Sequence, residues 1–146
     1  MHRLGTRVGA CLLLGATLCA VILLGAATNP KAERGKYLVE RACMCADCHT
    51  PMTPKGEPDM TKWLHGSPLF FSPKIKIPDW VEETPPLAGL AGYTDVQALQ
   101  MLQTGLKDGK PLRPPMPHFR FNREDAEAIV AYLRTLKPPA KPSGKR

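Results

Sequence analysis

Residues 45–49 read Cys45-Ala46-Asp47-Cys48-His49, which is the C-x-x-C-H pattern. Two thiols three positions apart at a helix end can reach the two vinyl groups of one haem and form thioether bonds with them. The next residue then lies beneath the iron, where its imidazole nitrogen can bind as the proximal ligand. The pattern therefore predicts covalent attachment of a c-type haem through Cys45 and Cys48, with His49 as the proximal iron ligand.

Other uses of this motif fit its surroundings less well. A thioredoxin-like dithiol follows a strand in a βαβ unit, and the sequence before Cys45 contains no strand pattern. A zinc site needs four ligands, and neither a second Cys pair nor an H-x3–5-H spacing follows. A disulfide is compatible with an exported protein but leaves His49 unexplained. Cys43 is an alternative attachment residue; the usual two-residue spacing favours Cys45 and leaves Cys43 as a free buried thiol or a disulfide partner.

The second axial ligand decides between electron transfer and the binding of small molecules, because a methionine thioether closes the iron and raises its reduction potential. Met116 lies in the proline-clamped stretch RPPMP at residues 113–117, and 116 − 49 = 67 residues separate it from His49. This length of chain can wrap over the far face of a haem. Met116 is the favoured distal ligand, His118 is the runner-up and His65 is a weaker candidate. The other methionines lie near the attachment motif or inside a predicted helix: Met44, Met52, Met60 and Met101.

The net charge of +7 is unevenly distributed along the chain. Residues 31–136 contain fourteen Lys and Arg against thirteen Asp and Glu, a difference of +1, and the other basic residues lie near the two ends. A nucleic-acid-binding protein concentrates positive charge along a groove and adds aromatic side chains for stacking. Residues 31–136 contain no such block, so the sequence argues against a nucleic-acid partner.

A 21-residue segment without charge, residues 8–28, follows Arg3 and Arg7. It is long enough to span the hydrocarbon core of a bilayer and has a basic flank. A cleaved signal peptide is the alternative, because the small residues 25–27 suit a cleavage site. The sequence therefore predicts an exported or anchored chain, and the length of the apolar run favours the anchor.

The first part of the folded chain is predicted to be one helix and a long loop. Asn29 suits a cap position and Pro30 suits the first helical position, which predicts a helix over residues 30–43. Eight prolines then occur between residues 51 and 86, and proline removes a hydrogen-bond donor and interrupts helices. A loop of this length is unusual in a compact domain unless a large cofactor organises it.

Two further helices are predicted towards the C-terminus. Thr94 and Gln97 form a capping box, and apolar residues then recur at helical spacing until Gly109. Asn122 caps the last helix, whose apolar stripe continues until the proline pair at residues 138–139.

The predicted fold class is all-α, because no alternating run of strand length occurs. About three to four helices around one covalent haem are expected, since three short helices alone bury little apolar surface. The predicted organisation is a signal-anchor or signal peptide over residues 1–29, one domain over 30–138 and a disordered basic tail over 139–146.

The chain resembles class I monohaem cytochromes c, in particular the membrane-bound type found beside periplasmic dehydrogenases and respiratory complexes. The resemblance covers about residues 31–138. It is carried by residues 34–39, 45–51, 62–64, 115–117, 124–126 and 128–134. In this class the first and last helices cross where a glycine of one approaches an aromatic residue of the other, and Gly35 and Tyr132 match those positions.

Two departures from the class pattern stand out. The interval from Gly35 to Cys45 is one residue longer, and Cys43 falls inside it. The proline-rich segment over residues 68–86, called the insert below, is strongly apolar. The insert is expected to form a wall that covers the haem, with a docking patch for a membrane partner as the alternative. Candidate hydrogen-bond donors to a haem propionate are Trp63, Trp80 and Tyr93.

The resemblance implies an electron carrier and not an enzyme, with one covalent haem c, His49 and Met116 as iron ligands, and redox proteins as electron donor and acceptor. It also implies a place at the periplasmic face of the cytoplasmic membrane, anchored through residues 8–28 if these are retained, or a soluble periplasmic protein after cleavage. Two alternatives remain open: a fixed haem subunit of a larger membrane redox complex, and an open-site haem peroxidase or sensor.

Overall fold

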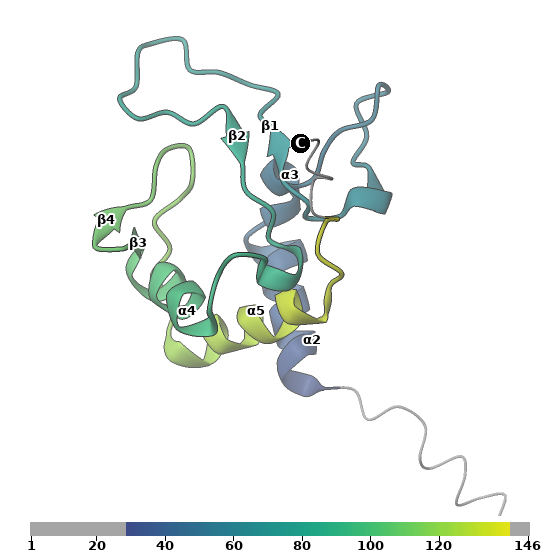
Figure 1. The fold of residues 1–146 in the computed structure, drawn as a ribbon, viewed down its shortest axis with the longest axis vertical. Coiled ribbons are helices and arrows are strands. Elements are labelled where there is room, and N and C mark those ends of the chain that lie inside the picture. Colours follow the sequence, from purple (N-terminus) through teal and green to yellow (C-terminus); the bar gives the residue numbers. More distant parts are fainter. Residues whose placement is uncertain (1–28, 141–146) are drawn as a thin grey trace, which may run out of the picture.

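A computed structural model describes residues 29–140 of the chain (Figure 1). Helices form the frame of this part, and two short antiparallel hairpins are added to it. The helical elements are α2 (Pro30–Tyr37), a π-helical turn (Leu38–Ala42), α3 (Cys45–His49), 3-10 turns at Met60–Lys62 and Ala88–Leu90, α4 (Asp95–Thr104) and α5 (Arg123–Thr135). The strands are β1 (Ser67–Pro68), β2 (Glu83–Thr84), β3 (Leu106–Lys107) and β4 (Lys110–Pro111). The helical frame agrees with the predicted class; the hairpins were missed because two-residue strands carry no alternating pattern.

Helices α2 and α5 pack directly against each other at Gly35. A Cβ atom at this position would lie 1.9 Å from the carbonyl oxygen of Ala128 and 2.9 Å from the Cβ of Tyr132. Only a residue without a side chain permits such a close approach of two backbones. The structure thus confirms the predicted contact between Gly35 and Tyr132.

The apolar stripe of α5 forms the centre of the core. It consists of Ala126, Ile129, Val130 and Leu133, all of which are buried. Ion pairs Lys31–Glu127 and Arg34–Asp125 flank the α2–α5 crossing. Exposed pairs of this kind contribute little to stability, so burial of the stripe and the close backbone contact hold the two helices together.

The extra residue between Gly35 and Cys45 is accommodated by the π-helical turn. The amide of Cys43 donates to the carbonyl oxygen of Leu38 at 2.9 Å, which spans five residues where an α-helix spans four. The predicted helix over residues 30–43 is therefore an α-helix only as far as Tyr37. The wider turn lets one additional residue enter the helix while the register of Gly35 against α5 is kept.

The π-helical turn is tied to α5 by a partly buried polar contact. The hydroxyl of Tyr132 donates to a carboxylate oxygen of Glu40 at 2.5 Å. Burial raises the pKa of Tyr132 to about 12, and the hydrogen bond to Glu40 acts in the same direction. Tyr132 therefore stays a neutral donor, and the contact fixes the turn that leads into α3.

The three predicted helix starts are confirmed by their caps. The side chain of Asn29 accepts from the amides of residues 31 and 32, and that of Asn122 accepts from the amide of Asp125 at 2.7 Å. Thr94 and Gln97 form the predicted capping box. These caps are local, which is why the sequence alone locates them.

The predicted end of the second helix at Gly109 is wrong. Helix α4 ends at Thr104, and the C-cap residue Gly105 has a left-handed conformation with φ of 66°. The chain then forms the β3–β4 hairpin, whose turn residues Asp108 and Gly109 have φ values of 51° and 75°. An Asp-Gly pair with two positive φ angles is typical of a tight hairpin turn, so Gly109 closes a hairpin and not a helix.

The described residues contain no helix that is both long and apolar enough to cross a bilayer. The predicted anchor or signal, residues 8–28, lies outside the described part of the chain, as does most of the predicted tail. The predicted boundaries at residues 29 and 139 therefore stay predictions.

The Gly35→Ala variant should lose about 3 kcal/mol or more of the free energy of unfolding, because its Cβ overlaps the Ala128 carbonyl and forces the helices apart. Gly56→Ala is the control: nothing lies within 4 Å of its Cβ position, and only a positive φ of 78° opposes the change. Strain of that kind costs about 1–2 kcal/mol. Urea unfolding of the haem-loaded protein measures both values, and equal losses would contradict the proposed crossing contact.

Candidate haem site

The C-x-x-C-H motif forms the short helix α3, which begins after Met44. Met44 has a left-handed conformation with φ of 47°, and this turns the chain out of the π-helical turn into α3. Cys45 and Cys48 are free thiols on consecutive turns of this helix, and both are partly exposed. His49 ends the helix and is buried, with 5% of its surface exposed.

The ring of His49 is held in one orientation by a backbone carbonyl. Its Nδ1 lies 2.8 Å from the carbonyl oxygen of Pro85. A carbonyl oxygen can only accept, so Nδ1 carries the proton and Nε2 keeps its lone pair. Burial lowers the pKa of His49, which also favours the neutral ring. A histidine held through Nδ1 in this way presents Nε2 to a metal.

The three thiols of this region are neutral at physiological pH. Burial raises the pKa of Cys45 to about 12, and it also raises the pKa values of Cys43 and Cys48. A thioredoxin-like dithiol needs a lowered thiol pKa, because the thiolate is the reactive form. The chemistry of this thiol pair therefore does not suit disulfide exchange.

The backbone around α3 is fixed by the two ends of the β1–β2 hairpin. The amide of Gly66 donates to the carbonyl oxygen of His49 at 2.8 Å. The hydroxyl of Thr84 donates to the carbonyl oxygen of Cys48 at 2.8 Å and accepts from the amide of Ser67 at 3.0 Å. The segment that carries Pro85 is thereby attached to the helix that carries His49.

Met116 lies in the methionine loop, defined as residues 112–121, and is partly exposed. Its amide donates to the carbonyl oxygen of Arg113 at 3.1 Å, which makes a tight turn. The amide of Val81 donates to the carbonyl oxygen of Pro114 at 2.9 Å, and Nε of Arg113 donates to the carbonyl oxygen of Asp79 at 3.0 Å. The insert therefore contacts both the segment of His49 and the segment of Met116.

The two alternative histidine ligands are engaged elsewhere in the fold. Nε2 of His118 lies 2.7 Å from the carbonyl oxygen of Leu112, inside the methionine loop. Nε2 of His65 lies 3.1 Å from the carbonyl oxygen of Lys137. Among the alternative methionines, Met44 and Met60 are largely exposed, Met101 belongs to α4, and Met52 forms an isolated bridge with Pro58.

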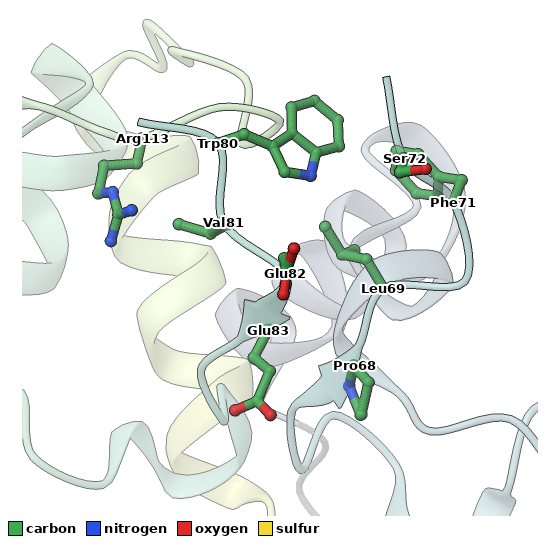
Figure 2. Close-up of a pocket in the computed structure, with 9 residues that line it drawn as sticks. All are labelled: Pro68, Leu69, Phe71, Ser72, Trp80, Val81, Glu82, Glu83 and Arg113. Atoms are coloured by element: carbon green, nitrogen blue, oxygen red, sulfur yellow. The ribbon is translucent and has the colours of Figure 1, made fainter. Parts of the chain in front are cut away.

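An open cavity of about 800 Å³ lies between the insert and the start of the methionine loop (Figure 2). Its walls are formed by Pro68, Leu69, Phe71, Ser72, Trp80, Val81, Glu82, Glu83 and Arg113. Of the three predicted propionate donors, only Trp80 lines this cavity. Trp63 packs against the core, and the hydroxyl of Tyr93 accepts from Nζ of Lys107. The predicted haem-attaching and iron-ligating residues do not line it.

The insert divides into two parts with different surroundings. Its root, residues 68–69 and 80–86, carries the hairpin and most of the cavity walls, whereas its tip, residues 70–79, exposes apolar side chains, with Phe70 66% and Ile75 75% exposed. In Figure 1 the tip forms an extended loop beyond β1 and β2. The tip contributes Phe71 and Ser72 to the cavity walls, and the predicted role of the insert as a haem wall stays a prediction.

These observations fit a covalently held haem. The chain provides two neutral thiols one helical turn apart, followed at once by a buried imidazole whose Nε2 is free to bind iron. A family model for cytochrome c matches residues 32–137. The chain belongs to the cytochrome c family.

Several cytochromes, two of them named as dehydrogenase subunits, are similar to this cytochrome c chain. The cytochrome subunit of fructose dehydrogenase from Gluconobacter japonicus is 32% identical over 121 residues, which cover 77% of this chain and 23% of that protein. The cytochrome c subunit of alcohol dehydrogenase (quinone) from Gluconacetobacter polyoxogenes is 32% identical over 127 residues, covering 80% and 26%. A dihaem cytochrome c-type protein from Cereibacter sphaeroides is 49% identical over 39 residues. The chain spans about a quarter of the length of the two dehydrogenase subunits.

Sequence reasoning missed the groups that orient this cytochrome's site. The partner of His49 is the backbone oxygen of Pro85, and a backbone oxygen has no signature in the side-chain pattern. The donor role of Arg113 was also not predicted. Its position directly before two prolines was the available signal, because those prolines lack amides and the loop needs other donors.

The Thr84→Val variant should lose about 1–3 kcal/mol of the free energy of unfolding, because it removes the hydroxyl that bonds Cys48 and Ser67 and leaves those backbone groups without a partner. Thr84→Ser keeps the hydroxyl and is the control, expected to stay close to the wild type. Chemical denaturation followed by far-UV circular dichroism compares the two. A Thr84→Ser loss as large as that of Thr84→Val would show that the methyl group, and not the hydroxyl, matters.

Proposed function

We propose that this chain is a one-electron carrier with one haem c, attached through Cys45 and Cys48 and ligated by His49 and Met116. The observation that carries the proposal is the buried ring of His49, whose Nδ1 proton is committed to Pro85 and whose Nε2 is left for iron. The sequence contains a single C-x-x-C-H motif, which supports a single haem.

The residues of the chain have distinct tasks in this function. Cys45 and Cys48 fix the haem by covalent bonds, so that the redox centre is not lost when its charge changes. His49 supplies a neutral nitrogen ligand in a fixed orientation. Met116 supplies a thioether, which raises the reduction potential and closes the iron to small molecules. A bound haem c supplies a centre that accepts and releases one electron.

The similar proteins and the N-terminal sequence support a physiological setting for this carrier. The named relatives are cytochrome subunits of dehydrogenases, which supports a redox protein as electron donor and another as acceptor. The uncharged residues 8–28 support a place on the periplasmic face of the cytoplasmic membrane, with the chain anchored there. The chain is then either a mobile carrier or one haem-bearing part of a larger dehydrogenase assembly.

Covalent attachment distinguishes Cys45 from Cys43. The double variant Cys45→Ser/Cys48→Ser should lose all haem on a denaturing gel, because no thioether remains. The matched double variant Cys43→Ser/Cys48→Ser should keep haem through the single thioether of Cys45. Haem staining of the gel and intact-mass measurement provide the readout, and the opposite pattern of retention would identify Cys43 as the attachment residue.

Ligation by Met116 is tested by absorption spectra of the haem-loaded protein. The ferric wild type should show the weak long-wavelength charge-transfer band of a methionine-ligated haem, and Met116→Ala should abolish it and open the reduced iron to carbon monoxide. Met101→Ala and His118→Ala are the controls and should keep the band. A wild type that lacks the band and binds carbon monoxide readily would favour the open-site peroxidase or sensor.

A further inference from the structure

The insert is attached firmly to the haem-attachment helix at its root. The β1–β2 pairing aligns Ser67 with Thr84, and the amide of Leu69 donates to the carbonyl oxygen of Glu82 at 2.8 Å. The hydroxyl of Thr84 and the carbonyl oxygen of Pro85 then reach Cys48 and the His49 ring. These hydrogen bonds fix the root of the insert relative to the helix that carries Cys48 and His49.

A neighbouring stretch of the insert reaches the methionine loop. Asp79 accepts from Nε of Arg113 at 3.0 Å, and Val81 donates to the carbonyl oxygen of Pro114 at 2.9 Å. The Asp79 backbone is in the left-handed region with φ of 58°, an uncommon conformation for a non-glycine residue. Only the Arg113 contact involves a side chain, so a single substitution can remove it.

The two ends of the methionine loop are anchored to a different part of the fold. The amide of Leu112 donates to the carbonyl oxygen of Gly105 at 2.9 Å, and the amide of Phe121 donates to the carbonyl oxygen of Leu102 at 3.2 Å. These contacts hold the loop to the end of α4. Within the described residues 29–140, the hydrogen bonds that residues 113–116 make outside the loop go to the insert. The position of Met116 relative to His49 therefore depends on the insert.

We propose that the insert is a clasp that restrains the Met116 thioether, and that Arg113 is the positioning residue through which the clasp holds the loop. This inference rests on the proposed ligation by Met116. The insert bonds both ligand-bearing segments, so it limits how far the distal segment can move from the proximal one. Loss of the Arg113 contact leaves the middle of the loop joined to the insert by the Val81–Pro114 backbone hydrogen bond alone, and an external ligand then competes more effectively with Met116.

The matched variants use the geometry of the contact. In Arg113→Gln the side-chain amide nitrogen occupies the same place along the chain as the arginine Nε, so the donor to Asp79 is kept and the charge is removed. In Arg113→Ala both are removed. Arg120→Ala is the control for a cation in the same loop, because within the described part of the chain Arg120 donates to the loop carbonyl oxygens of His118 and Phe119 and not to the insert.

The experiment titrates imidazole into the ferric, haem-loaded full chain and follows the loss of the charge-transfer band. Arg113→Ala should bind imidazole about fivefold more tightly than the wild type, which corresponds to about 1 kcal/mol. Arg113→Gln and Arg120→Ala should stay within about twofold, a difference of about 0.4 kcal/mol. Unchanged affinity in Arg113→Ala, or equal effects in Arg113→Gln and Arg113→Ala, would overturn the clasp.

The wild-type spectrum separates this outcome from the failure of the proposed function. If the wild type lacks the charge-transfer band, the proposed ligation by Met116 is wrong, and the clasp proposal, which rests on it, is wrong as well. If the band is present and the Arg113 variants behave as the control does, the carrier stands and only the clasp is wrong. If Arg113→Ala does not fold, amide hydrogen exchange of the wild type decides: Val81 should be protected as strongly as Leu69, and rapid exchange at Val81 would overturn the clasp.

Discussion

The close contact between α2 and α5 at Gly35 is the constraint on which the rest of the structure depends. It fixes the direction in which the chain leaves α2, and the π-helical turn then absorbs one extra residue before α3 begins. The Tyr132 hydroxyl and Glu40 lock this turn to α5. The position of the haem-attachment motif is thus set by a helix that lies about eighty residues further along the chain.

The proline-rich segments are ordered by hydrogen bonds that the proline carbonyl oxygens accept. Proline has no amide donor, but its carbonyl oxygen accepts hydrogen bonds as any other does. The oxygens of Pro51, Pro85 and Pro114 accept from the Asp59 amide, the His49 ring and the Val81 amide, respectively. A segment that reads as an unstructured loop therefore acts as a set of rigid acceptors. This explains how so long a connection can be part of a compact domain.

Local signals were predictable from the sequence, and contacts between distant segments were not. The caps at Asn29 and Asn122 depend on a few neighbouring residues, and the sequence locates both. Gly105 and Gly109 are equally suited to end a helix, and the choice depends on the β3–β4 hairpin that follows. The extra residue before Cys45 was visible in the sequence as a longer interval between Gly35 and Cys45. Its accommodation in a π-helical turn was not visible, because it depends on the contact of α5 with Gly35.

The candidate site shows the same difference between local signals, which the sequence reveals, and contacts between distant segments, which it does not. The candidate haem-binding side chains were named from spacing, whereas many of the groups that hold their segments in place are backbone groups contributed by the insert. A one-electron carrier works best when its ligands keep the same geometry in both redox states. Backbone hydrogen bonds to rigid proline segments supply that restraint without depending on the identity of most side chains. Substitutions in the insert should therefore preserve the proposed clasp, provided that the β1–β2 pairing is kept and that position 113 of the methionine loop keeps a donor towards the carbonyl oxygen of Asp79.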